Sequence, residues 1–121
     1  MKIYITHSSS FDFKSEIYMP IRRSELSTLH DFILPHEASD QVFDSKEIIL
    51  SCDFIIAEVS YPSTGMGIEL GWANNGSKKI LCLYKKGVRI SRSLRIVSTD
   101  FIEYKNPIDF IEKIKLFLHK L

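Results

Sequence analysis

Cysteine is scarce in this chain, and its placement excludes the usual cysteine-based sites. Cys52 and Cys82 lie far apart, belong to no CxxC or Cys/His pattern, and are surrounded by apolar residues. This context is typical of buried, reduced thiols. We therefore expect no disulfide, no zinc or other metal site, and no cofactor.

Charge of one sign is also scarce. Sixteen Lys and Arg residues oppose fifteen Asp and Glu residues, which leaves a formal net charge of +1 at pH 7. The basic residues are scattered apart from a few adjacent pairs. Because such a balance produces no strong field, we expect neither nucleic acid nor an anionic membrane as a partner.

The chain has no long hydrophobic run, and none approaches the length of a membrane span. Residues 1–5 enter strand-like sequence directly, without the regions of a signal peptide. Internal repeats, low-complexity tracts and linkers are absent too. We expect a cytoplasmic protein with a single domain over residues 1–121, since this length with 45% hydrophobic residues can bury one core.

Strand-like and helix-like segments alternate along the chain. Apolar patterning predicts strands at residues 2–6, 32–34, 54–59, 79–84 and 101–104, and helices at 13–27, 45–52, 67–75 and from 107 onward. Pro20 should kink or divide the first helix. With right-handed crossovers, the alternation predicts an α/β fold: a three-layer sandwich with a five-stranded parallel sheet in the flavodoxin-like order 2-1-3-4-5.

One strand–loop–helix segment concentrates residues suited to chemistry. After the apolar strand at 54–59 come Ser63, Gly65 and Gly67, and then Glu69 in the first turn of the predicted helix. Ligands of parallel sheets bind beyond the carboxyl ends of strands, near the N–H groups of the following helix. The helix dipole would favour an ionised Glu69, as a nucleophile requires. The spacing alone also fits an ordinary first-turn acid and loop-shaping glycines.

A longer motif gives this segment a family context. It reads Ala57-Glu58-Val59-Ser60, then Pro62-Ser63, then Gly65-x-Gly67-x-Glu69-Leu70-Gly71-x-Ala73. The motif resembles the signature of the nucleoside 2-deoxyribosyltransferase superfamily, and most closely the branch that hydrolyses 2'-deoxynucleoside 5'-monophosphates. Flanking segments that fit as well are Tyr4, Asp53, residues 80–84 and Ser91, so the resemblance covers most of the chain.

The resemblance implies cleavage of the N-glycosidic bond of a nucleoside or its 5'-monophosphate, by hydrolysis or by transfer to another nucleobase. Glu69 would attack the anomeric carbon and form a covalent glycosyl-enzyme. Tyr4 matches the family's first-strand tyrosine and would orient Glu69 by a hydrogen bond. The resemblance also implies a homodimer or higher homo-oligomer, in which the loop holding Ser91 completes a neighbouring subunit's site.

The acid that would protonate the leaving base departs from the family pattern. In the resembled branch a second carboxylate lies eight residues before the position of Asp53, and that count ends on Ser45 here. The adjacent Asp44 is our candidate for this acid. Asp44 also fits the start of the helix that follows, paired with Glu47 in a capping box.

The loop after the first strand, residues 7–10, lacks the glycine and arginine that help to hold a 5'-phosphate in the resembled branch. Ser8 matches a serine of that motif. Ser8, Ser63 and Ser91 are therefore candidate ligands of an anion or of a sugar hydroxyl. His7 and His36, expected at the same edge of the sheet, are further candidate substrate contacts.

Two other functions remain open from the sequence. The altered first loop and the displaced acid would fit a nucleotide-binding or interaction module that has kept the fold without catalysis. Residues 7–12 also loosely resemble TIR-like domains, which use a glutamate to cleave the nicotinamide bond of NAD. Ligand binding without turnover would indicate the first function, and release of nicotinamide the second.

Overall fold

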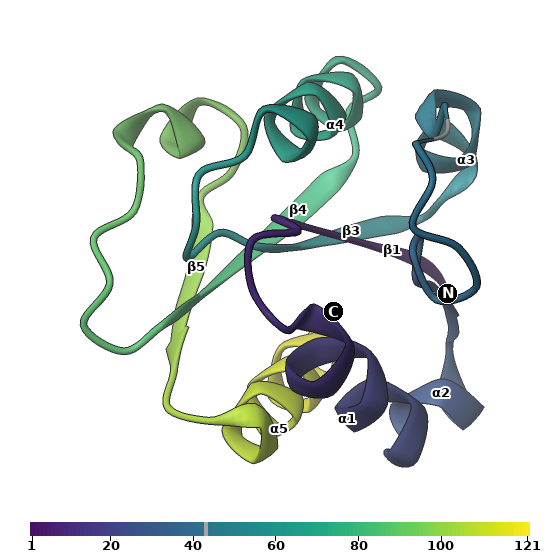
Figure 1. Ribbon diagram of the computed structural model, residues 1–121, viewed down its shortest axis with the longest axis vertical. Coiled ribbons are helices and arrows are strands. Elements are labelled where there is room, and N and C mark those ends of the chain that lie inside the picture. Colours follow the sequence, from purple (N-terminus) through teal and green to yellow (C-terminus); the bar gives the residue numbers. More distant parts are fainter. Residues whose placement is uncertain (43) are drawn as a thin grey trace.

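The computed structural model describes residues 1–42 and 44–121, and its centre is a parallel β-sheet (Figure 1). The strands are β1 (Lys2–His7), β2 (Asp31–Ile33), β3 (Phe54–Glu58), β4 (Lys79–Lys85) and β5 (Asp100–Tyr104). They are hydrogen-bonded in the order β2-β1-β3-β4-β5, and every described pairing is parallel. The predicted fold class and strand order are therefore confirmed.

Helices cover both faces of this sheet. α3 (Lys46–Ser51) and α4 (Thr64–Asn75) lie on one face, whereas α1 (Met19–Arg23), α2 (Leu26–Leu29) and α5 (Pro107–His119) lie on the other (Figure 1). A π-helical turn, η1 (Lys14–Tyr18), precedes α1, and a 3₁₀ turn, η2 (Arg92–Ile96), lies between β4 and β5. Within residues 1–42 and 44–121, no helix is both long and apolar enough to span a membrane.

Two hydrophobic clusters hold the three layers together. One packs α1, α2 and α5 on the sheet and includes Ile5, Ile17, Ile21, Phe110 and Ile114. The other packs α3 and α4 on the opposite face and includes Ile49, Ile55, Leu70, Ala73 and Cys82. Because β1, β3 and β4 contribute side chains to both clusters, their near-continuous apolar sequence is explained by burial on both faces.

Helix boundaries differ from the sequence prediction in two places. The predicted helix at 13–27 is divided into η1, α1 and α2, and Pro20 lies in the first turn of α1. α4 begins at Thr64 rather than at Gly67, because Ser63 caps it: Ser63 Oγ accepts a hydrogen bond from Met66 N at 3.4 Å. Gly65 and Gly67 are therefore helical, and the expectation that Glu69 lies in the first turn is wrong, since it lies in the second.

Candidate active site

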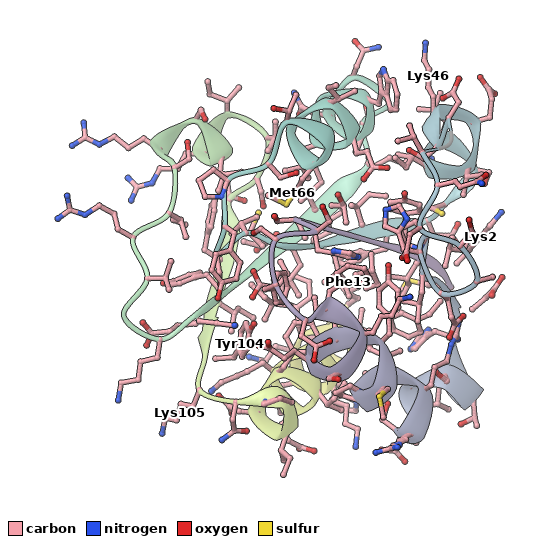
Figure 2. All side chains as sticks on the ribbon, viewed as in Figure 1. Lys2, Phe13, Lys46, Met66, Tyr104 and Lys105 are labelled. Atoms are coloured by element: carbon pink, nitrogen blue, oxygen red, sulfur yellow. The ribbon has the colours of Figure 1, made fainter. Side chains whose placement is uncertain are left out.

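A cavity of about 790 Å³ opens at the carboxyl edge of the sheet. The end of β1, the loops after β1 and β2, the residue before α3 and the first turns of α4 contribute its walls. Phe13 and Met66 lie on either side of the end of β1 in Figure 2, and both line the cavity. The aromatic lining residues are Tyr4, His7, Phe11, Phe13, His36 and Trp72. Its volume and its aromatic walls are typical of a small-molecule site.

Glu69 lies in the wall of this cavity and accepts three hydrogen bonds from hydroxyl groups. Tyr4 Oη donates to Glu69 Oε2 at 2.6 Å. Thr6 Oγ1 donates to Glu69 Oε1 at 2.7 Å, and Ser45 Oγ donates to Oε2 as well. Both oxygens of the half-buried carboxylate are thereby oriented by β1 and by the residue preceding α3.

The predicted hydrogen bond between Tyr4 and Glu69 is thus confirmed. Tyr4 is fully buried, and this burial, together with the adjacent Glu69 carboxylate, raises the pKa of its phenol far above the usual value. The phenol therefore keeps its proton and acts as a donor. Thr6 joins it because side chains two apart on a strand point to the same face. That spacing from Tyr4 is the only signal for Thr6 in the sequence, and it does not by itself single Thr6 out.

Ser45, and not Asp44, reaches Glu69. α3 begins at Lys46 with the buried Ser45 as its N-terminal flanking residue. Asp44 is exposed, its Oδ1 accepts a hydrogen bond from Lys46 N at 3.0 Å, and it does not line the cavity. Asp44 is therefore not placed as an acid beside Glu69, because a shift of one residue at a helix start turns a side chain by about 100°. Ser45 takes the N-cap position without a side-chain capping hydrogen bond, and Asp44, one residue earlier, accepts from the first N–H of α3. The predicted role of Asp44 at the helix start is therefore supported by this bond, with the N-cap position itself shifted by one residue.

The other predicted substrate contacts divide into two groups. His7, Ser63, Gly65 and His36 line the cavity, whereas Ser8, Gly67 and Ser91 do not. Ser8 is buried, and its Oγ lies 2.8 Å from Ser10 Oγ. Ser91 is exposed before η2, with its Oγ 2.8 Å from Ser93 Oγ. Ser9 and Trp72, which are not among the predicted substrate contacts, line the cavity as well.

His7 links two loops at the cavity wall. Its Nδ1 lies 2.8 Å from the carbonyl oxygen of Ser8, and its Nε2 lies 2.7 Å from Tyr18 Oη. Because a carbonyl only accepts, Nδ1 carries the proton and Nε2 accepts from Tyr18. Tyr18 Oη also accepts from His36 N at 3.1 Å. Burial lowers the pKa of His7, which keeps its ring neutral, so His7 joins the loop after β1 to the loop after β2.

Glu58, the other carboxylate of the motif, lies outside this cavity and is fully buried. Its Oε1 accepts from Ser60 N at 2.6 Å, and its Oε2 accepts from Ser60 Oγ at 2.9 Å and from Tyr104 Oη. Ser60 Oγ in turn accepts from Lys85 N at 2.8 Å. These bonds join the ends of β3, β4 and β5, which is a structural role.

Metal-ligand residues do not gather in the described part of the chain. Among residues 1–42 and 44–121, no group of three or more His, Cys, Asp or Glu side chains could hold a metal ion. Cys52 and Cys82 are both buried free thiols. Burial raises the pKa of the Cys82 thiol to about 12, so that it stays protonated.

Comparison with known proteins gives short sequence matches. No family model matches the chain. The chain is 54% identical over 39 residues to the 5-hydroxymethyl-dUMP N-hydrolase of Esox lucius, a match covering 32% of this chain and 27% of that protein. It is 47% identical over 45 residues to the protein of the same name from Tetraodon nigroviridis, covering 36% of this chain and 32% of that protein. The chain thus matches less than a third of the length of these two curated relatives.

The whole fold matches a solved structure. The CMP N-glycosidase of Clostridium botulinum covers 95% of this chain and 99% of its own, with 23% sequence identity and a TM-score of 0.69. This likeness supports the fold. Together with the N-hydrolase matches, it confirms the resemblance stated from the motif: the chain is similar to proteins of the nucleoside 2-deoxyribosyltransferase-like superfamily.

Proposed function

We propose that this chain cleaves the N-glycosidic bond of a nucleoside or of its 5'-monophosphate, with Glu69 as the nucleophile. The observation that carries the proposal is the carboxylate of Glu69, oriented by hydroxyl donors in the wall of an aromatic cavity. Relatives named as an N-hydrolase and an N-glycosidase support the same type of bond.

The proposed reaction has two displacements at the anomeric carbon. As the bond to the base breaks, its electron pair leaves with the base, and a Glu69 oxygen bonds to the carbon through an oxocarbenium-like transition state. Water then attacks the same carbon, and the bonding pair of the glycosyl ester returns to Glu69. A second nucleobase in place of water would give transfer. Tyr4 and Thr6 hold the two carboxylate oxygens in position throughout.

The cavity walls suggest how the substrate binds. We propose that the base lies among the rings of Phe11, Phe13 and Trp72, since planar bases stack favourably on aromatic side chains. The sugar and its 5' substituent would lie near Ser63 and Gly65, where the first N–H groups of α4 favour hydroxyl or anionic groups.

The test is chromatographic detection of free base after incubation with deoxynucleosides, their 5'-monophosphates and NAD, each with and without a second base. We expect the wild type to release base and Glu69→Gln to release none, with both proteins folded by circular dichroism. Binding without release from any substrate would contradict the proposal and favour a binding module. Release of nicotinamide alone would favour NAD cleavage.

We also propose that the chain acts as a homo-oligomer. Val42 and Ile68 line the cavity and are 99% and 49% exposed, and exposed apolar side chains at a cavity rim fit a protein contact. Ser91 lies away from the cavity of its own chain. Light scattering after size-exclusion chromatography checks the oligomeric state, and a monomer that releases base at full rate would contradict this proposal.

A further inference from the structure

The hydroxyl groups around Glu69 do not supply the proton that the leaving base needs in the proposed reaction. A departing base takes the electron pair of the glycosidic bond, and most nucleobases leave slowly unless they gain a proton. Thr6 and Ser45 carry aliphatic hydroxyls, which are not acids near neutral pH. The pKa of Tyr4 is raised, so its phenol keeps its proton. The proton donor must therefore lie elsewhere on the cavity wall.

Apart from Tyr4 and Glu69, the titratable side chains that line the cavity among the described residues are those of His7, Asp12, Lys14, His36 and Asp40. His7 is neutral and uses both ring nitrogens, as described above. Asp40 is exposed and pairs with Lys14 at 3.3 Å. Asp12 is also exposed, and its Oδ1 accepts from Ser15 N at 3.3 Å at the start of η1.

His36 is held at the cavity by its own backbone and by the residue that follows it. The backbone N–H of His36 donates to Tyr18 Oη at 3.1 Å. The next residue, Glu37, accepts two hydrogen bonds from Arg22, both at 2.8 Å, and Arg22 also donates to the Phe32 carbonyl oxygen at 3.1 Å. The turn after β2 is therefore tied to η1 and α1, which fixes where the half-buried imidazole enters the cavity.

The imidazole ring of His36 is also oriented by its neighbours. Its Nδ1 lies 3.3 Å from the carbonyl oxygen of Ser39, which favours a proton on that nitrogen. The ring centroids of Phe13 and His7 lie 6.0 and 6.1 Å from that of His36. Imidazole is the side chain best suited to give and take a proton near neutral pH.

We propose that His36 is a catalytic residue that protonates the leaving base; this rests on the proposed function. In the first displacement, protonated His36 transfers a proton to the base as the C–N electron pair moves to it and Glu69 bonds to the anomeric carbon. In the second, neutral His36 takes a proton from the attacking water as the glycosyl bond to Glu69 breaks. Both protons and both electron pairs are thereby accounted for.

The test compares a substrate whose base needs a proton with one whose base does not. 2'-Deoxyguanosine needs one, whereas N7-methyl-2'-deoxyguanosine carries a cationic base that leaves as a neutral molecule; their 5'-monophosphates are assayed alongside. We expect His36→Gln to lower kcat by about 100-fold on the unmethylated substrates and by less than about threefold on the methylated ones. The matched control is His119→Gln, at an exposed position at the end of α5, which should change neither.

The outcomes separate this inference from the proposed function. An equal loss of kcat in His36→Gln on both types of substrate, or no loss, would overturn the role of His36. The proposed function would still hold if base release continued to depend on Glu69. Absence of base release by the wild type from every substrate would overturn both. Melting temperatures of the two histidine variants show whether each is folded.

A pH profile gives a second readout that a structural role would not move. Wild-type kcat on the unmethylated substrate should decline at high pH, where the proton donor is no longer available, and the methylated substrate should show no such decline. His7 and Tyr18 contact His36, Glu37 follows it in the chain and pairs with Arg22, and Lys14 and Asp40 line the same cavity. If kcat of His36→Gln declined at high pH as it does in the wild type, the decline would belong to one of these other groups, which would contradict the proposal.

Discussion

Two carboxylates of the same short motif, Glu58 and Glu69, have similar partners and very different surroundings. Each accepts hydrogen bonds from one tyrosine and one serine. Glu58 is fully buried and meets no cavity, whereas Glu69 is half-buried and lines one. The comparison teaches that the donor set alone does not tell these two carboxylates apart, since only Glu69 has access to a cavity.

The largest expected contrast comes from neutralising each carboxylate in turn. Glu69→Gln should lower base release by at least about a thousandfold, because the amide cannot form the glycosyl ester. Glu58→Gln should instead lower the free energy of unfolding by about 1–3 kcal/mol, because the amide disturbs a buried hydrogen-bond network. Base-release assays and urea titrations of both variants measure the two effects. Similar losses of activity in two equally stable variants would break the comparison.

Tyr4 and Tyr104, the tyrosine partners of Glu69 and Glu58, should show the same contrast between activity and stability, with smaller effects. Tyr4→Phe removes a donor that orients Glu69, so we expect kcat to fall by about tenfold. Tyr104→Phe removes a donor from the closed Glu58 network, so we expect a loss of stability of about 1–3 kcal/mol with kcat within about twofold of the wild type. Steady-state kinetics and thermal unfolding distinguish the outcomes, and a Tyr104→Phe variant with the larger kcat loss would contradict the assignment.

The buried His7, hydrogen-bonded to Tyr18 beside the cavity, predicts that the stability of the fold depends on pH. The pKa of His7 is lowered from 6.5 by burial, so below that pH the unfolded chain binds a proton that the folded chain does not. Stability should therefore decline as the pH falls from about 6.5 towards the folded pKa, by less than about 1.4 kcal/mol per pH unit for this one group. His7→Asn should flatten the decline in urea titrations between pH 7.5 and 5.5.

His30 provides the control for that measurement. Its pKa is also lowered, by burial and by the amino-terminal charge, so it acts with the same sign in the same pH range. His30→Asn should remove only its own part of the decline and leave the part due to His7. If His30→Asn alone abolishes the decline, the His7 prediction is wrong.

The smallest expected effect is a change in KM, measured with alanine variants of two glycines of α4. A Cβ at Gly65 would meet nothing closer than Ser63 Oγ at 4.0 Å, and a Cβ at Gly67 would meet nothing within 4 Å. Only Gly65 lines the cavity. Gly65→Ala should therefore raise KM about threefold, whereas Gly67→Ala should leave it unchanged, and both should keep or raise stability by up to about 1 kcal/mol. Equal KM values would show that Gly65 does not meet the substrate.

The fold could be predicted from the sequence because local patterns and general rules agree. Apolar runs such as 54–59 and 79–84 indicate strands buried on both faces, and right-handed crossovers leave few strand orders. The start of α4 was missed because Gly65 and Gly67 are typical of loops, although Ser63 supplied a capping signal. The Ser63 cap and the burial of Met66 in the core outweigh the two glycines.

The place of the site at the carboxyl edge of the sheet could be predicted from the strand–loop–helix pattern, but the partner of Glu69 was supplied by the resemblance. Tyr4 and Glu69 were paired on that basis, and the pairing is present. Thr6 and Ser45 could not be assigned, because hydroxyl residues in strands and before helices are ordinary. Which of them reach Glu69 depends on how β1 and α3 are placed beside α4, and this placement is set by contacts distant in sequence.

The hydrogen bonds of Glu69 also make the site a reporter of folding. Its donors Tyr4, Thr6 and Ser45 lie 65, 63 and 24 residues away in the sequence. Such distant groups meet only after β1 has paired in the sheet and both helices have docked, and contacts of this separation form slowly. In a refolding experiment the recovery of base release should therefore follow the recovery of helix, and the delay between the two would time the final assembly of the chain.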